Sequence, residues 1–336
     1  MAEVPPVPDN IDPQYVIKEG NVIDDVVEAV EKADTLFEVE YLPGFEDRVG
    51  YFPILEHLPG SPVLARFSYG KNALNMSALF FDKVNESQVV NERHRKDFLK
   101  EQGFINYPNV IQVTGGFEGV EPQIEEVSLD TLKDKTKVTG NIIFTRDPRI
   151  TLNIIPADCP TGVLYCKDKE GNPIVAILHG GRDAIDAGMI RQGLGVLQDE
   201  YGVDLSEAVL GISPGILAKN YFITNEPERR GKGISERNWG PYITEKLTED
   251  PSEKRFVDLT SAYVMQAIEA GMDASKIQTY GGVDTYADAG KGKAFSRRRS
   301  DEHNGERPGG QMLAVGLNPN FVAKSPGLYS QASIAA

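Results

Sequence analysis

Short apolar runs separated by polar turns recur along most of the chain, which indicates a body rich in β-strands. Runs of this length that are rich in Val, Ile, Leu and Thr are typical of buried strands. The predicted strands cover Val63–Ser68, Val110–Val113, Ile142–Thr145, Thr151–Ile155, Gly162–Cys166, Ile174–Leu178, Ala208–Ile212 and Met312–Leu317. Strands outnumber helices and do not alternate strictly with them, so the pattern predicts an α+β fold rather than a doubly wound sheet.

Three longer stretches show apolar residues at helical spacing. They predict helices over Glu86–Glu101, over the stretch that begins near Asp183, and over Asp258–Ala270, which Gly271 ends. Asp183 is the expected N-cap of the second helix because a short acidic side chain can accept from the first free N–H groups. The stretch Ile223–Arg255 shows no clear periodicity and is expected to be irregular.

The first fifty residues differ from the rest of the chain. They open with a proline-rich stretch and continue into one helical pattern at Val22–Phe37. We therefore expect an acidic N-terminal extension at residues 1–50 and a single body at residues 51–336.

Charge and composition exclude some classes of partner. The chain has 35 Lys and Arg against 50 Asp and Glu, a net charge of −15, and this excess repels nucleic-acid backbones. No apolar run is long enough to cross a bilayer, and no signal peptide is recognisable at the N-terminus. With only two cysteines, Cys159 and Cys166, the chain is expected to be cytoplasmic, and small molecules are its expected partners.

Cys159 and His179 are the main candidates for chemistry. Cys159 follows a predicted strand in Ala157-Asp158-Cys159, and His179 ends another strand immediately before Gly180-Gly181. The pair could bind one zinc ion, act as thiolate nucleophile and base, or combine both roles. The alternative is a small core cysteine and a turn histidine with no chemical role.

Two further features could bind an anion. The helix that follows Gly180 and Gly181 presents free N–H groups at its N-terminus. Later, Arg297, Arg298 and Arg299 form a basic run in an acidic chain, and guanidinium groups suit phosphate. A solvated loop that balances nearby acidic residues is the alternative for this run.

Several of these segments, in this order, resemble the laccase-domain family, also called YfiH-like or polyphenol-oxidase-like proteins. The family pattern includes Asn-Leu-Gly, Asn-Arg, Gln-Val-His-Gly, Ala-Asp-Cys, His-Ala-Gly-Trp-Arg-Gly, Cys-Thr-Tyr, Phe-Phe-Ser-Tyr-Arg-Arg-Asp and Thr-Gly-Arg. The corresponding segments here are Leu74-Asn75, Asn91-Glu92-Arg93, Gln112-Val113-Thr114-Gly115, Ala157-Asp158-Cys159, His179-Gly180-Gly181-Arg182-Asp183, Asp284-Thr285-Tyr286, Phe295-Ser296-Arg297-Arg298-Arg299 and Gly309-Gly310-Gln311.

The resemblance implies a layered α+β fold with a mixed β core flanked by helices. It also implies a purine-nucleoside enzyme that uses phosphorolysis of adenosine, inosine or methylthioadenosine, or deamination, with a nucleoside and phosphate as partners. The family's zinc ion is held by two histidines and one cysteine, and these positions fall on Thr114, Cys159 and His179. A copper oxidase is not expected, because four histidines are too few for a multicopper cluster and a blue-copper site.

Departures from the family pattern leave other functions open. Thr114 is a poor zinc ligand, so the zinc site is altered, and His57, His303 or Asp158 would have to replace it. Proteins of the same superfamily fold include metal-independent Cys–His hydrolases, for which Cys159 and His179 would suffice. The replacements at Arg182, Asp183, Asp284 and Gly310 also suit a non-catalytic relative that binds a ligand or partner.

Overall fold

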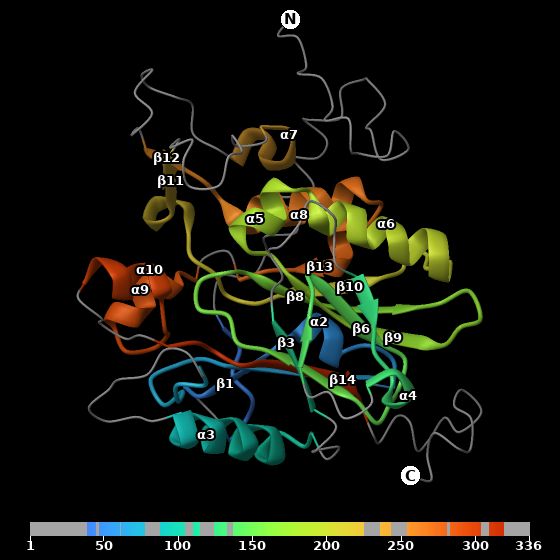
Figure 1. Cartoon of the computed structure of the whole chain (residues 1–336), viewed down its shortest axis with the longest axis horizontal. Helices are drawn as coiled ribbons and strands as arrows, with labels where there is room; N and C mark the ends of the chain where they lie inside the picture. The colour runs from blue at the N-terminus through green and yellow to red at the C-terminus, as the bar shows by residue number, and fades with distance from the viewer. Residues whose placement is uncertain are drawn as a thin grey trace, which may run out of the picture.

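The computed structural model contains two six-stranded sheets that lie between helices (Figure 1). It describes residues 39–44, 47–60, 62–77, 88–104, 110–114, 124–132, 137–224, 236–242, 254–280, 283–303 and 309–318. Most of the predicted extension, including the helix expected at Val22–Phe37, lies outside these residues. Its described end joins the body, because Tyr41 bridges Gly50 and Leu42 N–H donates to Val49 O at 2.9 Å.

The first sheet mixes antiparallel and parallel strands. Its order is β1 (Val49–Tyr51), β2 (Val63–Ser68), β14 (Leu313–Leu317), β7 (Thr151–Ile154), β3 (Val110–Thr114) and β5 (Lys137–Thr139). The first four are antiparallel neighbours, and β3 runs parallel to both β7 and β5.

The second sheet is built around a long antiparallel pair. Its order is β13 (Ile277–Gln278), β10 (Val209–Ile212), β8 (Thr161–Lys167), β9 (Pro173–His179), β6 (Ile142–Thr145) and β4 (Ile124–Glu126). β8 and β9 pair over seven residues, and the outer strands β13 and β4 run parallel to their neighbours. A separate antiparallel ribbon joins β11 (Phe222–Thr224) to β12 (Lys254–Phe256).

The helices are mostly short. They are α2 (Pro53–Glu56), α3 (Gln88–Glu101), α4 (Leu129–Leu132), α5 (Arg182–Asp186), α6 (Met189–Tyr201), α7 (Glu236–Trp239), α8 (Leu259–Glu269), α9 (Thr285–Gly290) and α10 (Arg297–Glu302). In Figure 1, α3 lies below the sheets, and α5, α6 and α8 lie above them.

Residues alternate between the two faces of each strand, and so the sheets contribute to three apolar clusters. These clusters separate four layers: the helices α5, α6 and α8, the second sheet, the first sheet, and the helix α3. Side chains such as Val163 and Ile177 face the first sheet, whereas Leu164 and Ala176 face the helices α6 and α8. On the outer face of the first sheet, Ala314 packs with Phe98 and Leu99 of α3. The expected layered α+β fold, with a mixed β core flanked by helices, is confirmed.

The helix predicted to begin at Asp183 differs from the expectation. Its N-cap is Gly181, and Asp183 lies inside α5. Gly188, with a φ of 68°, then separates α5 from α6 because a left-handed residue cannot continue a right-handed helix. The prediction that Ile223–Arg255 is irregular was also wrong in part, since the two ends of this stretch pair as β11 and β12.

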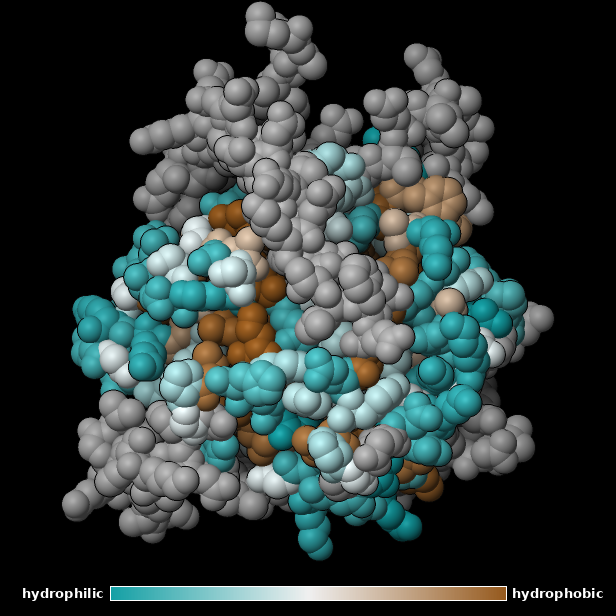
Figure 2. Space-filling view, turned by 180° about the vertical axis from the view of Figure 1, so that it is seen from behind, coloured by the Kyte–Doolittle hydropathy of each residue, from teal (hydrophilic) through white to brown (hydrophobic). Residues whose placement is uncertain are grey.

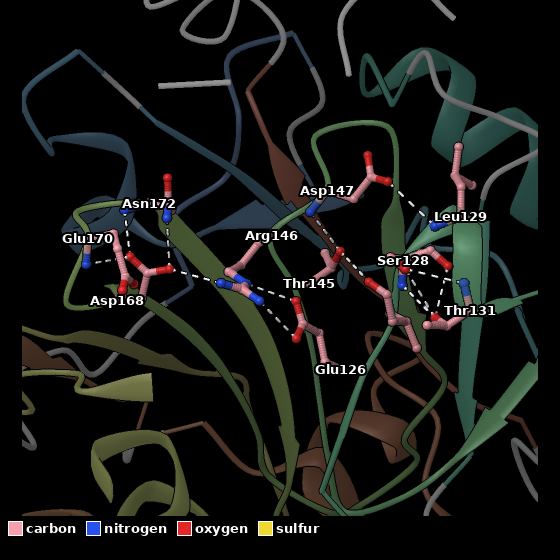
Figure 3. A network of polar contacts seen from close by, with 11 residues as sticks. Glu126, Ser128, Leu129, Thr131, Thr145, Arg146, Asp147, Asp168, Glu170 and Asn172 are labelled. Atoms are coloured by element: carbon pink, nitrogen blue, oxygen red, sulfur yellow. Dashed lines mark hydrogen bonds and ion pairs between the residues drawn. The ribbon is translucent and has the colours of Figure 1, made fainter. Parts of the chain in front are cut away.

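A network of hydrogen bonds and ion pairs joins neighbouring strands of the second sheet at the end that lies away from His179 (Figure 3). Arg146, which follows β6, donates through Nε to Glu126 of β4 at 2.8 Å and through Nη1 to Asp168 at 3.0 Å. Asp168 in turn accepts from the N–H groups of Glu170 and Asn172 in the turn between β8 and β9. The network holds three strands of this sheet in register.

Most of the described surface in Figure 2 is hydrophilic, with hydrophobic residues in places between. Among the described residues, the large apolar side chains that are well exposed are Leu74 and Phe256. Among the same residues, no helix has the length and hydropathy that a membrane span requires.

A buried ion pair between α6 and α8 provides a test of this packing. Arg191 and Glu269 are 3% and 7% exposed, and Arg191 also donates to Asn238 at 2.7 Å. Replacing Glu269 with Gln leaves a buried guanidinium without its counter-charge, so we expect a loss of about 3 kcal/mol or more in unfolding free energy. The matched control is Asp301→Asn in the exposed pair with Arg297, which should cost less than about 1 kcal/mol. Equal losses in urea denaturation would contradict this packing.

Candidate functional site

The loop that carries Cys159 and the turn that follows His179 meet at one end of the β8–β9 pair. β8 begins at Thr161, which pairs with His179 at the end of β9. Gly180 N–H then donates to Pro160 O at 3.0 Å, which joins the two segments. The structure therefore brings together the cysteine and the histidine that the sequence singled out.

Of the two glycines after His179, Gly180 leaves no room for a side chain and Gly181 leaves little. A Cβ at position 180 would collide with the ring of Tyr263 and lie 2.7 Å from Pro160 O. A Cβ at position 181 would lie 3.4 Å from both Cys159 Sγ and His179 Nε2. The thiol and this ring nitrogen thus face the same point beside Gly181. The Gly180 N–H, predicted to bind phosphate, is already engaged by Pro160.

Burial keeps both groups of the pair uncharged. It raises the pKa of Cys159 to about 12, and the carboxylates of Asp158 and Asp183 add to this rise, against a hydrogen bond from the Arg182 N–H. Burial also lowers the pKa of His179 to about 4. At neutral pH the site therefore holds a thiol and a neutral imidazole, not a thiolate–imidazolium pair.

Asp158 joins the loop that carries Cys159 to helix α10 by hydrogen bonds. Its carboxylate is 8% exposed and accepts from Thr285 Oγ1 and from Arg298 N–H, each at 2.8 Å. Burial raises the pKa of this carboxyl, while its hydrogen bonds to the start of α10 oppose the rise. Through Asp158 the basic run, distant in sequence, comes to the candidate site.

The two predicted phosphate-binding arginines are already engaged. The Arg298 guanidinium donates to Phe222 O at 2.9 Å, lies 4.4 Å from the centre of the Phe222 ring and faces Glu302 at 3.7 Å. Arg299 lies 5.4 Å from the centre of the Tyr286 ring and fills the space beside Gly290. Of the two, Arg298 is the one that acts electrostatically on Tyr221, a neighbour of Cys159 described next.

Tyr221 is a site residue that the sequence did not reveal. Burial raises its pKa, Cys159 adds to the rise, and Arg182 and Arg298 oppose it, so these three residues are within electrostatic range of its hydroxyl. Arg298 also stacks on its ring at 5.2 Å from the centre. Tyr221 stands outside every motif that was singled out, and only the tertiary fold places it here.

The departures from the family pattern have structural roles. Arg182 begins α5 and keeps 37% of its side chain exposed, with Asp183 at 3.8 Å. Asp284 caps α9 by accepting from Tyr286 N–H at 3.2 Å, and it also accepts from Asn220 Nδ2 at 2.5 Å.

The donors present do not fit a three-ligand zinc site. Cys159 and His179 supply two ligands, and Thr114 ends β3 with a side chain outside what the structure describes. Within the described ranges, no three His, Cys, Asp or Glu side chains gather as a metal site would require. The three replacements suggested by the sequence have other surroundings here: Asp158 binds α10, His303 contacts Tyr286 at 3.0 Å, and His57 is exposed after α2.

Comparison with solved structures defines the class of fold. The chain is similar to the Bacillus licheniformis hypothetical protein YfiH, with a TM-score of 0.56 and 18% identity over 76% of this chain and 93% of that one. It is similar to YlmD from Geobacillus stearothermophilus, with a TM-score of 0.59 and 17% identity over 84% and 99%. A Neisseria meningitidis DUF152 protein gives 0.53 and 15% over 76% and 95%.

The sequence assigns the family. Residues 109–317 match the model described as Multi-copper polyphenol oxidoreductase laccase, which covers more than half of the chain. The chain therefore belongs to this laccase-like, YfiH-type family, as the sequence motifs predicted. No curated protein matches the chain in sequence.

The neutral state of Cys159 predicts slow and pH-dependent alkylation. Because the thiolate is the reactive form, iodoacetamide labelling should be slow at pH 7 and should keep rising up to pH 10. Asp183→Asn removes a negative charge that raises the pKa of Cys159, so it should label a few-fold faster, whereas Asp204→Asn, on the loop before β10, should not. Labelling of each cysteine is followed by mass spectrometry. A rate that levels off near pH 7 would contradict the neutral thiol.

Proposed function

We propose that this protein is a purine-nucleoside-processing enzyme that cleaves adenosine- or inosine-type nucleosides by phosphorolysis, with a metal site altered from that of its family. The observation that carries the proposal is the shared position of Cys159, His179 and Arg182 around the Gly181 turn, on the fold of this family. Deamination of the base is the other reaction that the resemblance implies for this site. A small-molecule substrate and a cytoplasmic location stay predictions.

In the proposed reaction, an oxygen of inorganic phosphate bonds to C1′ of the ribose while the bond from C1′ to the purine breaks. The electron pair of that bond leaves on the purine, which takes up the proton that hydrogen phosphate gives up as its oxygen bonds to C1′. Phosphate needs cationic partners. We assign this role first to Arg182, whose side chain is 37% exposed, and second to Arg298, because both act electrostatically on Tyr221 beside Cys159.

Cys159 and His179 would bind and orient the nucleoside as neutral groups. A thiol and an uncharged imidazole can each donate or accept one hydrogen bond. Tyr221 offers an aromatic ring and a hydroxyl beside them. Zinc would supply a Lewis acid to this family's reaction, but the described residues give it two ligands, so the proposed chemistry rests on the chain's own side chains.

Of the other two functions, the described site favours a non-catalytic relative that binds a nucleoside-like ligand. Its support is the incomplete ligand set together with the neutral thiol. A Cys–His hydrolase has less support, since such an enzyme depends on an activated thiolate, and both pKa shifts oppose the ion pair.

The test is phosphate-dependent release of free base from adenosine, inosine and methylthioadenosine, measured on the full chain. We expect Arg182→Gln to raise the KM for phosphate at least about tenfold, the equivalent of about 1.4 kcal/mol, because it removes a charged hydrogen-bond donor. Cys159→Ser and His179→Gln should lower kcat.

Matched controls separate the site from general damage. Cys166→Ser changes the other free cysteine, which is buried within β8, and His57→Gln changes an exposed histidine after α2. Both should leave turnover unchanged. Nucleoside binding without release of base would favour the non-catalytic relative, and neither binding nor turnover would overturn the proposed substrate class.

A further inference from the structure

Asn141 lies beside His179 in the second sheet. It immediately precedes β6, which pairs antiparallel with β9 through Ile142 and Leu178. His179 N–H donates to Asn141 O at 2.8 Å, so the pairing continues one residue beyond the strand. His179 thus has Thr161 as its neighbour on one side and Asn141 on the other.

The side chain of Asn141 is buried without a hydrogen-bond partner. The residue is 0% exposed, and neither Oδ1 nor Nδ2 has a partner among the described residues. An amide has two donor hydrogens and an acceptor oxygen, and leaving such groups buried without partners is unfavourable. A polar neighbour that needs this amide is therefore the natural explanation of its burial.

The sheet geometry points to the ring of His179 as that neighbour. Residues directly opposite in an antiparallel pair project their side chains to the same face, with Cβ atoms about 4.5–5.5 Å apart. That spacing leaves room for one buried water to join the amide to the imidazole. The Cε1–Nε2 edge of the ring and Cys159 Sγ lie near the same point beside Gly181.

We propose that Asn141 is a positioning residue that acts on His179 through one buried water, which accepts from Nδ1–H of His179 and donates to the amide oxygen of Asn141. The proton on Nδ1 leaves Nε2 with a lone pair that faces Cys159. The partner of one ring nitrogen decides which nitrogen carries the proton, so Asn141 selects the form of His179 that can accept a proton or bind a metal at Nε2. This role holds whichever reaction the site performs.

The test is the tautomer of His179, read from long-range ¹H–¹⁵N NMR correlations of the full chain. Only four histidines are present, and His179→Gln identifies the signal. We expect the wild-type ring to carry its proton on Nδ1. Asn141→Leu removes the acceptor at similar volume and should move a substantial fraction of the ring to the Nε2–H form.

The matched control is Gln102→Leu. Gln102 follows α3 and is 6% exposed, and both of its amide atoms also lack a hydrogen-bond partner in the described part of the chain. Its substitution should leave the His179 signals unchanged. A merely structural effect of removing a buried amide would act alike at both positions.

Asn141→Asp keeps an acceptor of the same shape and should keep the proton on Nδ1, which provides a second variant if Asn141→Leu does not fold. An Nε2–H tautomer in the wild-type protein or in Asn141→Asp would overturn the proposal. So would an unchanged tautomer in a folded Asn141→Leu variant. None of these readouts depends on turnover, so the proposed function can fail independently.

Discussion

The antiparallel pairing of β8 with β9 is the constraint on which the rest of the structure depends. It runs from Thr161 opposite His179 to Lys167 opposite Pro173, with a tight turn at Asp168. One face of the pair builds the core between the sheets, and the other face builds the core under α6 and α8. A slip of one residue would turn His179 away from its present face. The register therefore fixes both cores and the candidate site together.

The same pairing explains the electrostatics of the site. Strand ends that lie between packed layers are poorly hydrated, so each ionisable group there favours its neutral form. Burial therefore raises the pKa of Cys159 and lowers the pKa of His179. Nearby carboxylates strengthen the effect on the thiol. A bound cation would favour the thiolate, but the described residues offer it two donors.

Much of the fold was predictable because strands of this type are local patterns. The apolar runs from Val63–Ser68 to Met312–Leu317 all became strands with nearly the expected ends. The helix start at Asp183 was predicted wrongly, because the packing of Gly180 against Tyr263 moves the cap to Gly181. That close approach depends on a residue more than eighty positions away, and no local pattern reports it.

The site residues that belong to sequence motifs were predictable, and those that only tertiary packing brings to the site were not. Cys159 stood out because it follows a predicted strand beside Asp158, and His179 because it ends a strand before two glycines. Tyr221 and Asn141 belong to no motif, and their places follow from sheet register and long loops. Arg298 was found, but its stacking on Phe222 was not.

The central claim is that Cys159 and His179 form a neutral pair without a complete metal site, and zinc affinity tests it most directly. Full-length, tag-free protein is titrated with zinc against a chelator of known affinity, beside Cys159→Ala. Two ligands should give binding weaker than about 1 μM, that is, less favourable than about −8 kcal/mol. One zinc per chain that resists a nanomolar chelator, and that Cys159→Ala loses, would contradict the account and reveal a third ligand.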